Sequence, residues 1–347
     1  MSEASTASDP AAQPLDGEPR ARVAVVGATG LTGALAARLV WRHPGLELVA
    51  ATSRCDAGRR LDELYPQHGV PMALTALEPD AVGEAEAAIV AVPHGASAPV
   101  VADLRRRGAL VVDLSADFRL RDQATYDRVY GPHGAPELLG DAVYGLTELN
   151  RERVRDAELV ANPGCYPTAA LLALAPLAEA GLCGDVVVDA KSGVSGAGRG
   201  GADFADVVEN FKAYGVEGHR HAPELSQELQ ALGAAGAITF VPHLLPIDQG
   251  LLTSCYVTPT RETSHDELVA LYEARYADEP FVGLVDAPPG VRDVRDTNAA
   301  HVCVAREDGS GRLMAFCAID NLWKGAAGQA IQNLNLVLGL PETEGLL

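Results

Sequence analysis

Residues 22–41 read RVAVVGATGLTGALAARLVW. Residues 22–26 form a short run rich in β-branched side chains, which favours a strand, whereas residues 34–41 are rich in Ala and Leu, which favour a helix. Glycines at positions 27, 30 and 33 lie between them. A strand, a glycine-rich turn and a helix in this order are typical of a dinucleotide-binding fingerprint, in which the helix N-terminus receives the pyrophosphate. A plain tight turn is the alternative, but this context favours an α/β fold of the Rossmann type.

The next strand is expected to contact the far end of the dinucleotide. Residues 46–51 form the predicted strand, which ends at Thr52-Ser53-Arg54. A site for NAD usually places a carboxylate here to bind the ribose 2′-hydroxyl. A hydroxyl and a guanidinium instead suit a 2′-phosphate through charge-assisted hydrogen bonds. We therefore expect NADP rather than NAD; the alternative is that Arg54 is a solvated arginine at a strand end.

A second turn, ANPGCYP at residues 161–167, carries the candidate nucleophile. A short strand is predicted to stop at Asn162-Pro163, a dipeptide typical of turns. Because proline is tolerated in the first turn of a helix, Pro167 fits the start of a helix that continues to residue 179. Cys165 then lies at the positive end of the helix, where N–H groups favour a thiolate and an oxyanion. The other five cysteines lack such a turn and are expected to be buried apolar residues.

Two further strand ends supply candidate ligands, because ligands bind beyond the carboxyl ends of strands in an open α/β sheet. Residues 87–92 are predicted as a buried strand that runs into Pro93, which is therefore expected beside the cofactor. Residues 108–114 are predicted as the next strand and lead to Arg119. Arg119 is a candidate phosphate clamp, and the alternative is a surface ion pair with a neighbouring aspartate.

A second glycine-rich loop, KSGVSGAGRGG at residues 191–201, follows the strand predicted at residues 185–190. So many glycines outside a helix start indicate backbone amides that contact a ligand. Lys191 and Arg199 favour an anion at this loop. The alternative is a flexible loop in solvent.

The segment GHRHAPE at residues 218–224 precedes a helix predicted at residues 223–232. In extended backbone His219 and His221 point to one face and Arg220 to the other. A metal site would need a third ligand with fitting spacing, and none is evident, so no metal is predicted. We expect one of the two histidines to be the base for Cys165 and Arg220 to bind an anionic group of the substrate. The spacing does not separate His219 from His221.

The composition indicates a globular protein of 347 residues, which is long enough for two packed domains. The net charge of −20 argues against nucleic acid or an anionic membrane as a main partner, and no apolar run approaches the length of a membrane span. Six cysteines without metal-ligand spacing suggest a reducing compartment, so the cytoplasm is expected. Residues 1–19 lack the segments of a signal peptide and are predicted to be a disordered tail.

Together these motifs resemble those of the N-acetyl-γ-glutamyl-phosphate reductases, which are relatives of aspartate-semialdehyde dehydrogenase. The matching pieces run in order from about residue 23 to residue 339 and are GATGLTG, VPHG, SADFR, NPGCYPT, SGVSGAGR, GHRHAPE and DNLWKGAAGQA. The chain departs from the family at Leu31, where tyrosine is common. The resemblance implies a doubly wound Rossmann domain, residues 20–164 and 322–347. It also implies an inserted α+β domain with a mixed sheet for catalysis and dimerisation, residues 165–321, and a dimer or tetramer.

The motifs and the resemblance together give the expected site. The resemblance implies that Cys165 is the nucleophile and His219 the acid–base residue. The expected cofactor contacts are Gly27, Thr29, Gly30, Leu31, Thr32, Gly33, Ser53, Arg54, Pro93, Ser192, Gly193 and Asn321. The expected substrate contacts are Arg119, Asn162, Ser195, Arg199, Arg220, His221 and Glu224.

The implied reaction is the NADPH-dependent reduction of N-acetyl-γ-glutamyl phosphate to N-acetylglutamate 5-semialdehyde and phosphate, through a thioacyl group on Cys165, in arginine biosynthesis. One alternative substrate is an aminoadipyl or glutamyl phosphate held on a carrier protein, and another is that of aspartate-semialdehyde dehydrogenase. A simple alcohol or 2-hydroxy-acid dehydrogenase has no need of the cysteine. A non-catalytic NADP sensor has no need of the thiol, the histidine pair and the glycine loops together.

Overall fold

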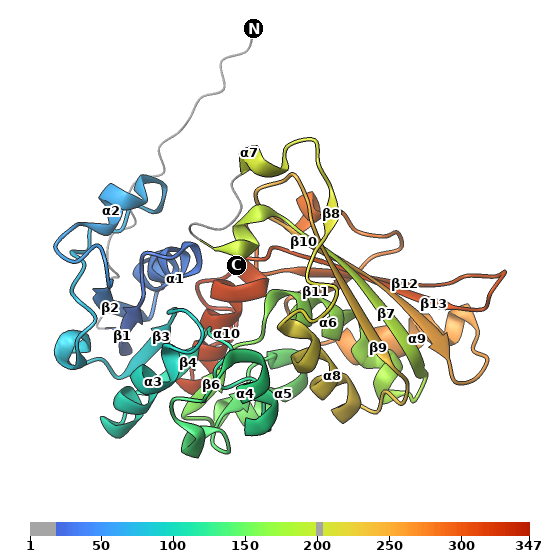
Figure 1. Cartoon of the computed structure of the whole chain (residues 1–347), viewed down its shortest axis with the longest axis horizontal. Coiled ribbons are helices and arrows are strands. Elements are labelled where there is room, and N and C mark those ends of the chain that lie inside the picture. The colour runs from blue at the N-terminus through green and yellow to red at the C-terminus, as the bar shows by residue number, and fades with distance from the viewer. Residues whose placement is uncertain (1–18, 199–203) are drawn as a thin grey trace, which may run out of the picture.

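The computed structural model describes residues 19–198 and 204–347, and these residues form two sheets with separate apolar cores (Figure 1). The predicted tail therefore lies outside the described residues, apart from Pro19. No helix in the described ranges is both long and apolar enough to cross a bilayer.

The first sheet has six parallel strands in the order β2-β1-β3-β4-β6-β5. Its strands are β1 (Ala21–Val26), β2 (Leu46–Thr52), β3 (Ala87–Val90), β4 (Leu110–Asp113), β5 (Val143–Tyr144) and β6 (Leu159–Ala161). The strands read as continuous apolar runs because a parallel sheet is buried on both faces. The strand order reverses at β1, so a ligand crevice is expected at the carboxyl ends of β1 and β3.

Helices cover both faces of this sheet, as a doubly wound fold requires. Val23 and Val25 of β1 pack in one core with α1 (Leu31–Arg42) and α10 (Gly328–Val337), whereas Ala24 and Val26 pack in another with α3 (Ser97–Arg106). The predicted Rossmann-type architecture is thus confirmed. Shorter helices complete this half of the molecule: α2 (Leu61–Leu64), α4 (Gln123–Tyr130) and α5 (Thr147–Arg155).

The second sheet has seven strands in the order β11-β12-β13-β10-β7-β9-β8. Its strands are β7 (Cys183–Ser192), β8 (Lys212–Ala213), β9 (Ile238–Leu244), β10 (Leu251–Pro259), β11 (Val282–Leu284), β12 (Ala300–Arg306) and β13 (Leu313–Ile319). The pairs β7/β9 and β11/β12 are parallel, and the other pairs are antiparallel. The predicted mixed sheet is therefore confirmed.

The helix α6 (Cys165–Glu179) is the centre of this second half. Residues Tyr166 to Ala178 are all buried, and a helix that is apolar on every side belongs in a core. It packs against β10, β13 and α8 (His221–Ala231). Two other helices, α7 (Phe204–Val207) and α9 (His265–Tyr276), complete this half. The sequence interpretation contained neither of them.

The C-terminal segment returns from the second sheet to the first (Figure 1). This segment begins with a π-helical turn, Trp323–Ala327, which is followed by α10. In this π turn, the N–H groups of Gly325 and Ala327 donate to the carbonyls of Asp320 and Leu322, five residues earlier in each case. The turn faces the beginning of α6.

Candidate active site

One cavity of about 940 Å³ lies between the two halves of the molecule. It collects most of the predicted site residues: Gly27, Thr29, Gly30, Leu31, Thr32, Gly33, Ser53, Arg54, Pro93, Arg119, Asn162, Cys165, Ser195, Arg220, His221 and Asn321. The structure does not bring Ser192, Gly193, His219 or Glu224 to the cavity wall. Arg199 lies outside the described residues.

The glycine turn between β1 and α1 forms one end of the cavity. Gly27 has a φ of +87°, a conformation that favours glycine, and its N–H donates to the Thr52 carbonyl (3.2 Å). A Cβ at position 33 would collide with the Gly27 carbonyl, so the helix can approach the turn only with glycine there. A Cβ at position 30 would meet nothing within 4 Å. The open side of the turn therefore has room for a pyrophosphate at the helix N-terminus.

The end of β2 forms the next part of the wall. The Ser53 hydroxyl is 2.9 Å from the Thr29 hydroxyl and accepts the N–H of Asp56 (3.1 Å). Arg54 is exposed and lines the cavity, as does Cys55. Cys55 is exposed rather than buried, so the expectation of a buried thiol there was wrong because the residue follows the strand and lies in the loop. Cys183, Cys255, Cys303 and Cys317 are buried as expected.

Cys165 is the first residue of α6, and Gly164 is the N-cap. The thiol is therefore at the positive end of a helix, as predicted. Burial nevertheless raises the pKa of the Cys165 thiol to about 11, while the charge of Arg119 and nearby backbone N–H groups lower it. Because burial outweighs the helix terminus, the thiol is protonated at neutral pH and needs a base.

His221 approaches the turn that precedes this cysteine. A Cβ added at Gly164 would lie 2.6 Å from His221 Nε2 and 3.0 Å from Arg119 Nη1, so only glycine allows this approach. Among the described residues, no hydrogen-bond partner is found for the buried Nδ1 of His221. Burial, followed by the charge of Arg119, holds the pKa of His221 well below its ordinary value. The imidazole is therefore neutral and able to accept a proton.

His219 has a different setting. Its Nδ1 accepts the backbone N–H of His221 (3.1 Å), and its ring packs against those of Tyr166, Tyr214 and Phe240. His221 opens α8, so the two histidines do not share an extended segment as the sequence suggested. The geometry favours His221 over His219 as the base, and the role expected for His219 stays a prediction.

Arg119 is almost completely buried rather than exposed. Its Nε donates to the Asn162 carbonyl (2.7 Å), and its Nη2 donates to the Leu114 carbonyl (2.7 Å). The alternative of a surface ion pair with a neighbouring aspartate was wrong. Asp117 instead accepts N–H groups at the start of α3, and Asp122 caps α4. The two backbone carbonyls fix the guanidinium at the cavity.

Glu224 binds the turn that precedes Cys165 and lies outside the cavity wall. Its Oε1 accepts the Gly164 N–H (2.8 Å) and the Tyr144 hydroxyl (2.8 Å), and its Oε2 accepts Arg119 Nη1 (3.3 Å). Glu224 was expected to contact substrate, but this buried carboxylate is occupied by protein donors and does not line the cavity. It orients Gly164 and Arg119 instead.

The second glycine loop reaches the cavity through Ser195 rather than through Ser192 and Gly193. The Ser195 hydroxyl donates to the Asp248 carbonyl (2.7 Å) and accepts Asn321 Nδ2 (3.0 Å). A Cβ at Gly193 would lie 2.5 Å from the Asp248 carbonyl oxygen, so this glycine is explained by packing against the neighbouring loop. Lys191, expected to favour an anion, pairs with Asp189.

Two further parts of the wall lie outside the list of predicted site residues. His94 lines the cavity, and its Nδ1 accepts the Ala116 N–H (2.9 Å). Burial and the charge of Arg119 lower the pKa of His94 to about 4. Gly325 and Ala326 of the π turn form the wall beside the cysteine, and the run of small residues there was the available signal. In residues 19–198 and 204–347, no cluster of three or more His, Cys, Asp or Glu side chains is arranged to hold a metal.

Similar proteins extend over almost the entire chain. The N-acetyl-gamma-glutamyl-phosphate reductase of Desulforudis audaxviator (strain MP104C) is 48% identical over 340 residues, which cover 94% of this chain and 98% of that one. The protein of the same name from Moorella thermoacetica (strain ATCC 39073 / JCM 9320) is 48% identical and covers 94% of this chain and 97% of its own. The chain belongs to the N-acetyl-gamma-glutamyl-phosphate reductase family. The resemblance predicted from the motifs is confirmed.

Family models and solved structures place this reductase family among the semialdehyde dehydrogenases. The model for the "Semialdehyde dehydrogenase, NAD binding domain" matches residues 22–157, and that for the "dimerisation domain" matches residues 165–321. Aspartate semialdehyde dehydrogenase II of Vibrio cholerae, complexed with ASA, has a TM-score of 0.70 at 18% identity and covers 93% of this chain and 99% of its own. The Candida albicans enzyme with NADP has a TM-score of 0.69 at 14% identity, with 91% and 98% covered. At such low identities these structures show that the reductase family shares their fold.

Proposed function

We propose that the protein is a cytoplasmic enzyme that reduces N-acetyl-γ-glutamyl phosphate to N-acetylglutamate 5-semialdehyde, with release of phosphate. The proposal rests on one observation. Cys165, His221 and Arg119 lie together at one end of a cavity whose other end is the glycine turn. The names of the relatives, nearly half identical to the chain, supply the substrate.

His221 and the start of α6 act on the first step. His221 Nε2 takes the thiol proton of Cys165, and the resulting thiolate attacks the acyl-phosphate carbonyl and expels phosphate. N–H groups at the helix N-terminus stabilise the tetrahedral oxyanion, an effect worth about 3 kcal/mol for a well-placed donor. His221, now charged, returns its proton to the oxygen of the thiohemiacetal or to the departing group as the semialdehyde forms.

Arginines recognise the anionic groups of the substrate in a protein whose net charge is −20. Arg119 Nη1 lies beside Gly164 and therefore beside the reacting carbonyl. Arg220 lines the same cavity but is exposed. Arg119 suits the phosphate because it is fixed and close, and Arg220 suits a carboxylate nearer the cavity mouth.

The groove at the glycine turn would hold NADPH, which would supply the hydride that reduces the thioester. Gly30 leaves space at the N-terminus of α1, and Ser53 and Arg54 offer donors to a 2′-phosphate. Replacing Arg54 with alanine is expected to lower kcat/KM for NADP much more than for NAD. An unchanged ratio of the two would contradict the role of Arg54.

The direct test is NADP- and phosphate-dependent oxidation of N-acetylglutamate semialdehyde, followed as NADPH formation. Cys165→Ser is expected to abolish it, and acyl phosphate without NADPH is expected to leave a thioacyl adduct that mass spectrometry detects on Cys165. Aspartate semialdehyde and a carrier-linked semialdehyde are the comparison substrates. Higher kcat/KM for either of them would reassign the substrate, whereas no adduct with any acyl phosphate would refute the thioester route.

The two halves of the molecule have different roles, and the second sheet also has a face that suits a homodimer interface. Residues 20–164 with 322–347 hold NADP and supply Arg119, and residues 165–321 supply Cys165 and His221. One face of the second sheet packs on α6, α8 and α9, whereas the other presents partly exposed apolar side chains: Leu252, Tyr256, Met314 and Phe316. Light scattering is expected to give twice the mass of one chain, and Tyr256→Glu is expected to give monomers. A wild-type monomer would exclude this interface.

A further inference from the structure

The backbone of the π turn touches the carbon that carries the nucleophilic sulfur. A Cβ added at Gly325 would lie 2.8 Å from Cys165 Cβ and 3.2 Å from the Asp320 carbonyl oxygen. The Asn162 side chain donates to the Ala326 carbonyl (3.2 Å), which ties the turn to the segment before Cys165. π turns are uncommon and often occur at functional sites, because they are retained only where other contacts support them. The contacts that hold the π turn therefore also affect the position of Cys165.

Lys324 supports the turn from inside the molecule. Its side chain is completely buried, and its Nζ donates to Glu148 Oε1 (2.5 Å) and to Gln332 Oε1 (2.7 Å). Nζ also lies 5.6 Å from the centre of the Phe281 ring. Glu148 comes from α5 and Gln332 from α10, so the ammonium fixes the turn to both helices.

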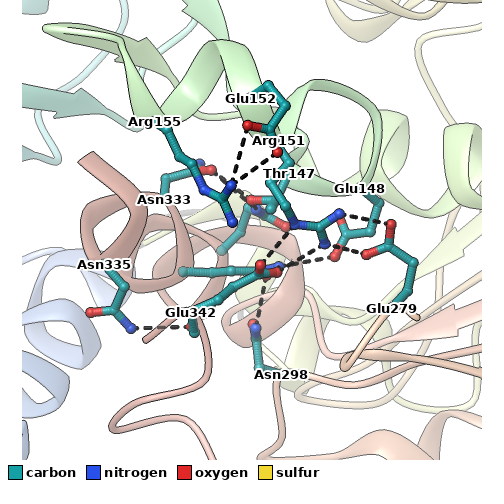
Figure 2. Close-up of polar contacts among 12 residues, drawn as sticks. Thr147, Glu148, Arg151, Glu152, Arg155, Glu279, Asn298, Asn333, Asn335 and Glu342 are labelled. Carbon is teal, nitrogen blue, oxygen red and sulfur yellow. Dashed lines mark hydrogen bonds and ion pairs between the residues drawn. The ribbon is translucent and has the colours of Figure 1, made fainter. Parts of the chain in front are cut away.

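The pair belongs to a polar network at the junction of the two halves, because Gln332 bonds to both of its members. Figure 2 shows this network around Glu148. Asn298, beside the second sheet, donates to Gln332 Oε1 (3.1 Å). Gln332 Nε2 also donates to Glu342 Oε1 (2.8 Å), which connects this network to Arg151, whose guanidinium bonds to Glu279 and Glu342 (Figure 2). A control for the junction as a whole therefore has to lie outside this network.

A buried ion pair is a poor way to gain stability alone. Desolvation of two charges opposes their attraction, and apolar side chains of similar volume often stabilise a fold equally well or better. An ion pair instead fixes the position of the side chain, because the ammonium has to donate hydrogen bonds to oxygen atoms at defined places. Lys324 therefore fixes the position of its neighbour Gly325 more closely than an apolar side chain would.

We propose that Lys324 is a positioning residue for Cys165: its ion pair with Glu148 holds the π turn, whose Gly325 backbone keeps the sulfur aligned with His221. The proposal rests on the proposed role of Cys165 as nucleophile and deepens it. Neither Lys324 nor Glu148 touches the cavity, so both act through the turn.

The test uses the double variant Glu148→Gln/Lys324→Met, which removes both charges and leaves no unpaired charge in the core. The readout is alkylation of Cys165 by iodoacetamide across pH, followed by peptide mass spectrometry so that Cys55 is counted separately. At neutral pH the rate is expected to fall by about tenfold or more, as misplacement of reacting groups by about 1 Å commonly does. At a pH near that of thiol ionisation the rates are expected to converge, because the base is no longer needed.

Two other variants keep the outcome decisive. Arg121→Met removes a charge from a contact between the halves that lies outside this network, the pair of Arg121 with Glu228, and is expected to leave the alkylation profile unchanged. Gly325→Ala leaves the ion pair intact but presses on Cys165, and it is expected to reproduce the loss at neutral pH even if the double variant fails to fold. A wild-type profile for Gly325→Ala, or faster alkylation at every pH in the double variant, would overturn the proposal. Alkylation needs no substrate, so the proposed reaction can fail in its own assay without affecting this result.

Discussion

At the scale of single residues, the chemistry depends on opposing influences on one sulfur atom. The helix N-terminus and Arg119 favour the thiolate of Cys165, but burial prevails and raises the pKa to about 11. A protonated thiol is protected from oxidation in the resting protein. Activation therefore has to come from a base in contact with it, which makes the placement of a neutral imidazole the deciding feature of the site.

The thiol pKa leads to a prediction about reactivity. At neutral pH only a small fraction of Cys165 is ionised, so in a His221→Asn protein the alkylation rate is expected to rise about tenfold per pH unit up to the region of pH 11. Iodoacetamide kinetics at Cys165, read by mass spectrometry, measure this rise. A plateau reached below pH 9 would show that the thiolate is stabilised far more than the burial of Cys165 allows.

The histidine pair gives a second prediction. His221→Asn is expected to lower kcat by about 10² to 10⁴, because it removes the proton acceptor beside Gly164. His219→Asn is the matched control and is expected to lose much less, since its ring packs among Tyr166, Tyr214 and Phe240. The measurement is steady-state reduction of the acyl phosphate with both variants. The reverse order of losses would assign the acid–base role to His219.

At the scale of elements, one face of α8 contacts both the cysteine turn and the segment that carries Arg119. His221, Glu224 and Gln227 are spaced three residues apart and therefore point in similar directions. Gln227 donates to the Arg119 carbonyl (3.0 Å) and accepts the Arg121 N–H (2.8 Å), while Glu224 accepts the Gly164 N–H. A single helix thus sets the distance between the imidazole, the guanidinium and the cysteine turn.

This arrangement makes Glu224 important for stability. Glu224→Ala leaves Arg119 buried without its carboxylate and leaves the Gly164 N–H without an acceptor, so a loss of about 3–5 kcal/mol is expected. Urea unfolding measures the loss. Arg155→Ala is the control, because its pair with Glu152 is exposed at both ends and is worth about 1 kcal/mol or less. Equal effects of the two substitutions would contradict the role given to Glu224.

The elements that could be predicted are those specified by residues close together in the sequence. The strand, glycine turn and helix at residues 22–41 are consecutive, and Pro167 marks the first turn of α6, so both sites could be predicted. The partner of Arg119 could not, because Glu224 is distant in sequence and the nearer aspartates were equally plausible. The π turn could not be predicted either, since its Gly and Ala residues fit an ordinary helix and the wider turn depends on the distant Glu148.

At the scale of the whole molecule, neutral histidines whose pKa is lowered affect the response of the fold to acid. Burial lowers the pKa of His68, His94 and His219 to about 4, whereas an unfolded chain titrates near the ordinary value of 6.5. Between these values the unfolded state binds more protons than the folded state. The stability from the histidines is therefore complete above pH 6.5 and declines as the pH falls toward 4. Asp113, whose pKa burial raises to about 6, acts in the opposite direction.

His68 provides the cleanest test of this effect because it lies outside the main cavity and stacks on Tyr65. His68→Gln is expected to flatten the dependence of Tm on pH between 6.5 and 4, while the wild type loses stability over that interval. Calorimetry of both proteins across this range supplies the comparison. Parallel curves for the two proteins would show that His68 takes up its proton without unfolding.

The return of the C-terminal helix to the first sheet affects how the chain is made. Residues of α10, together with Leu340 and Leu346, share a core with Val23 and Val25 of the first strand, and Arg20 pairs with Glu344. A ribosome synthesises these residues only after the whole of residues 165–321. The nascent nucleotide-binding half must therefore keep an apolar surface uncovered while the whole catalytic half is translated, which makes it a natural client for chaperones. A transcript that stops before α10 would leave that surface open permanently.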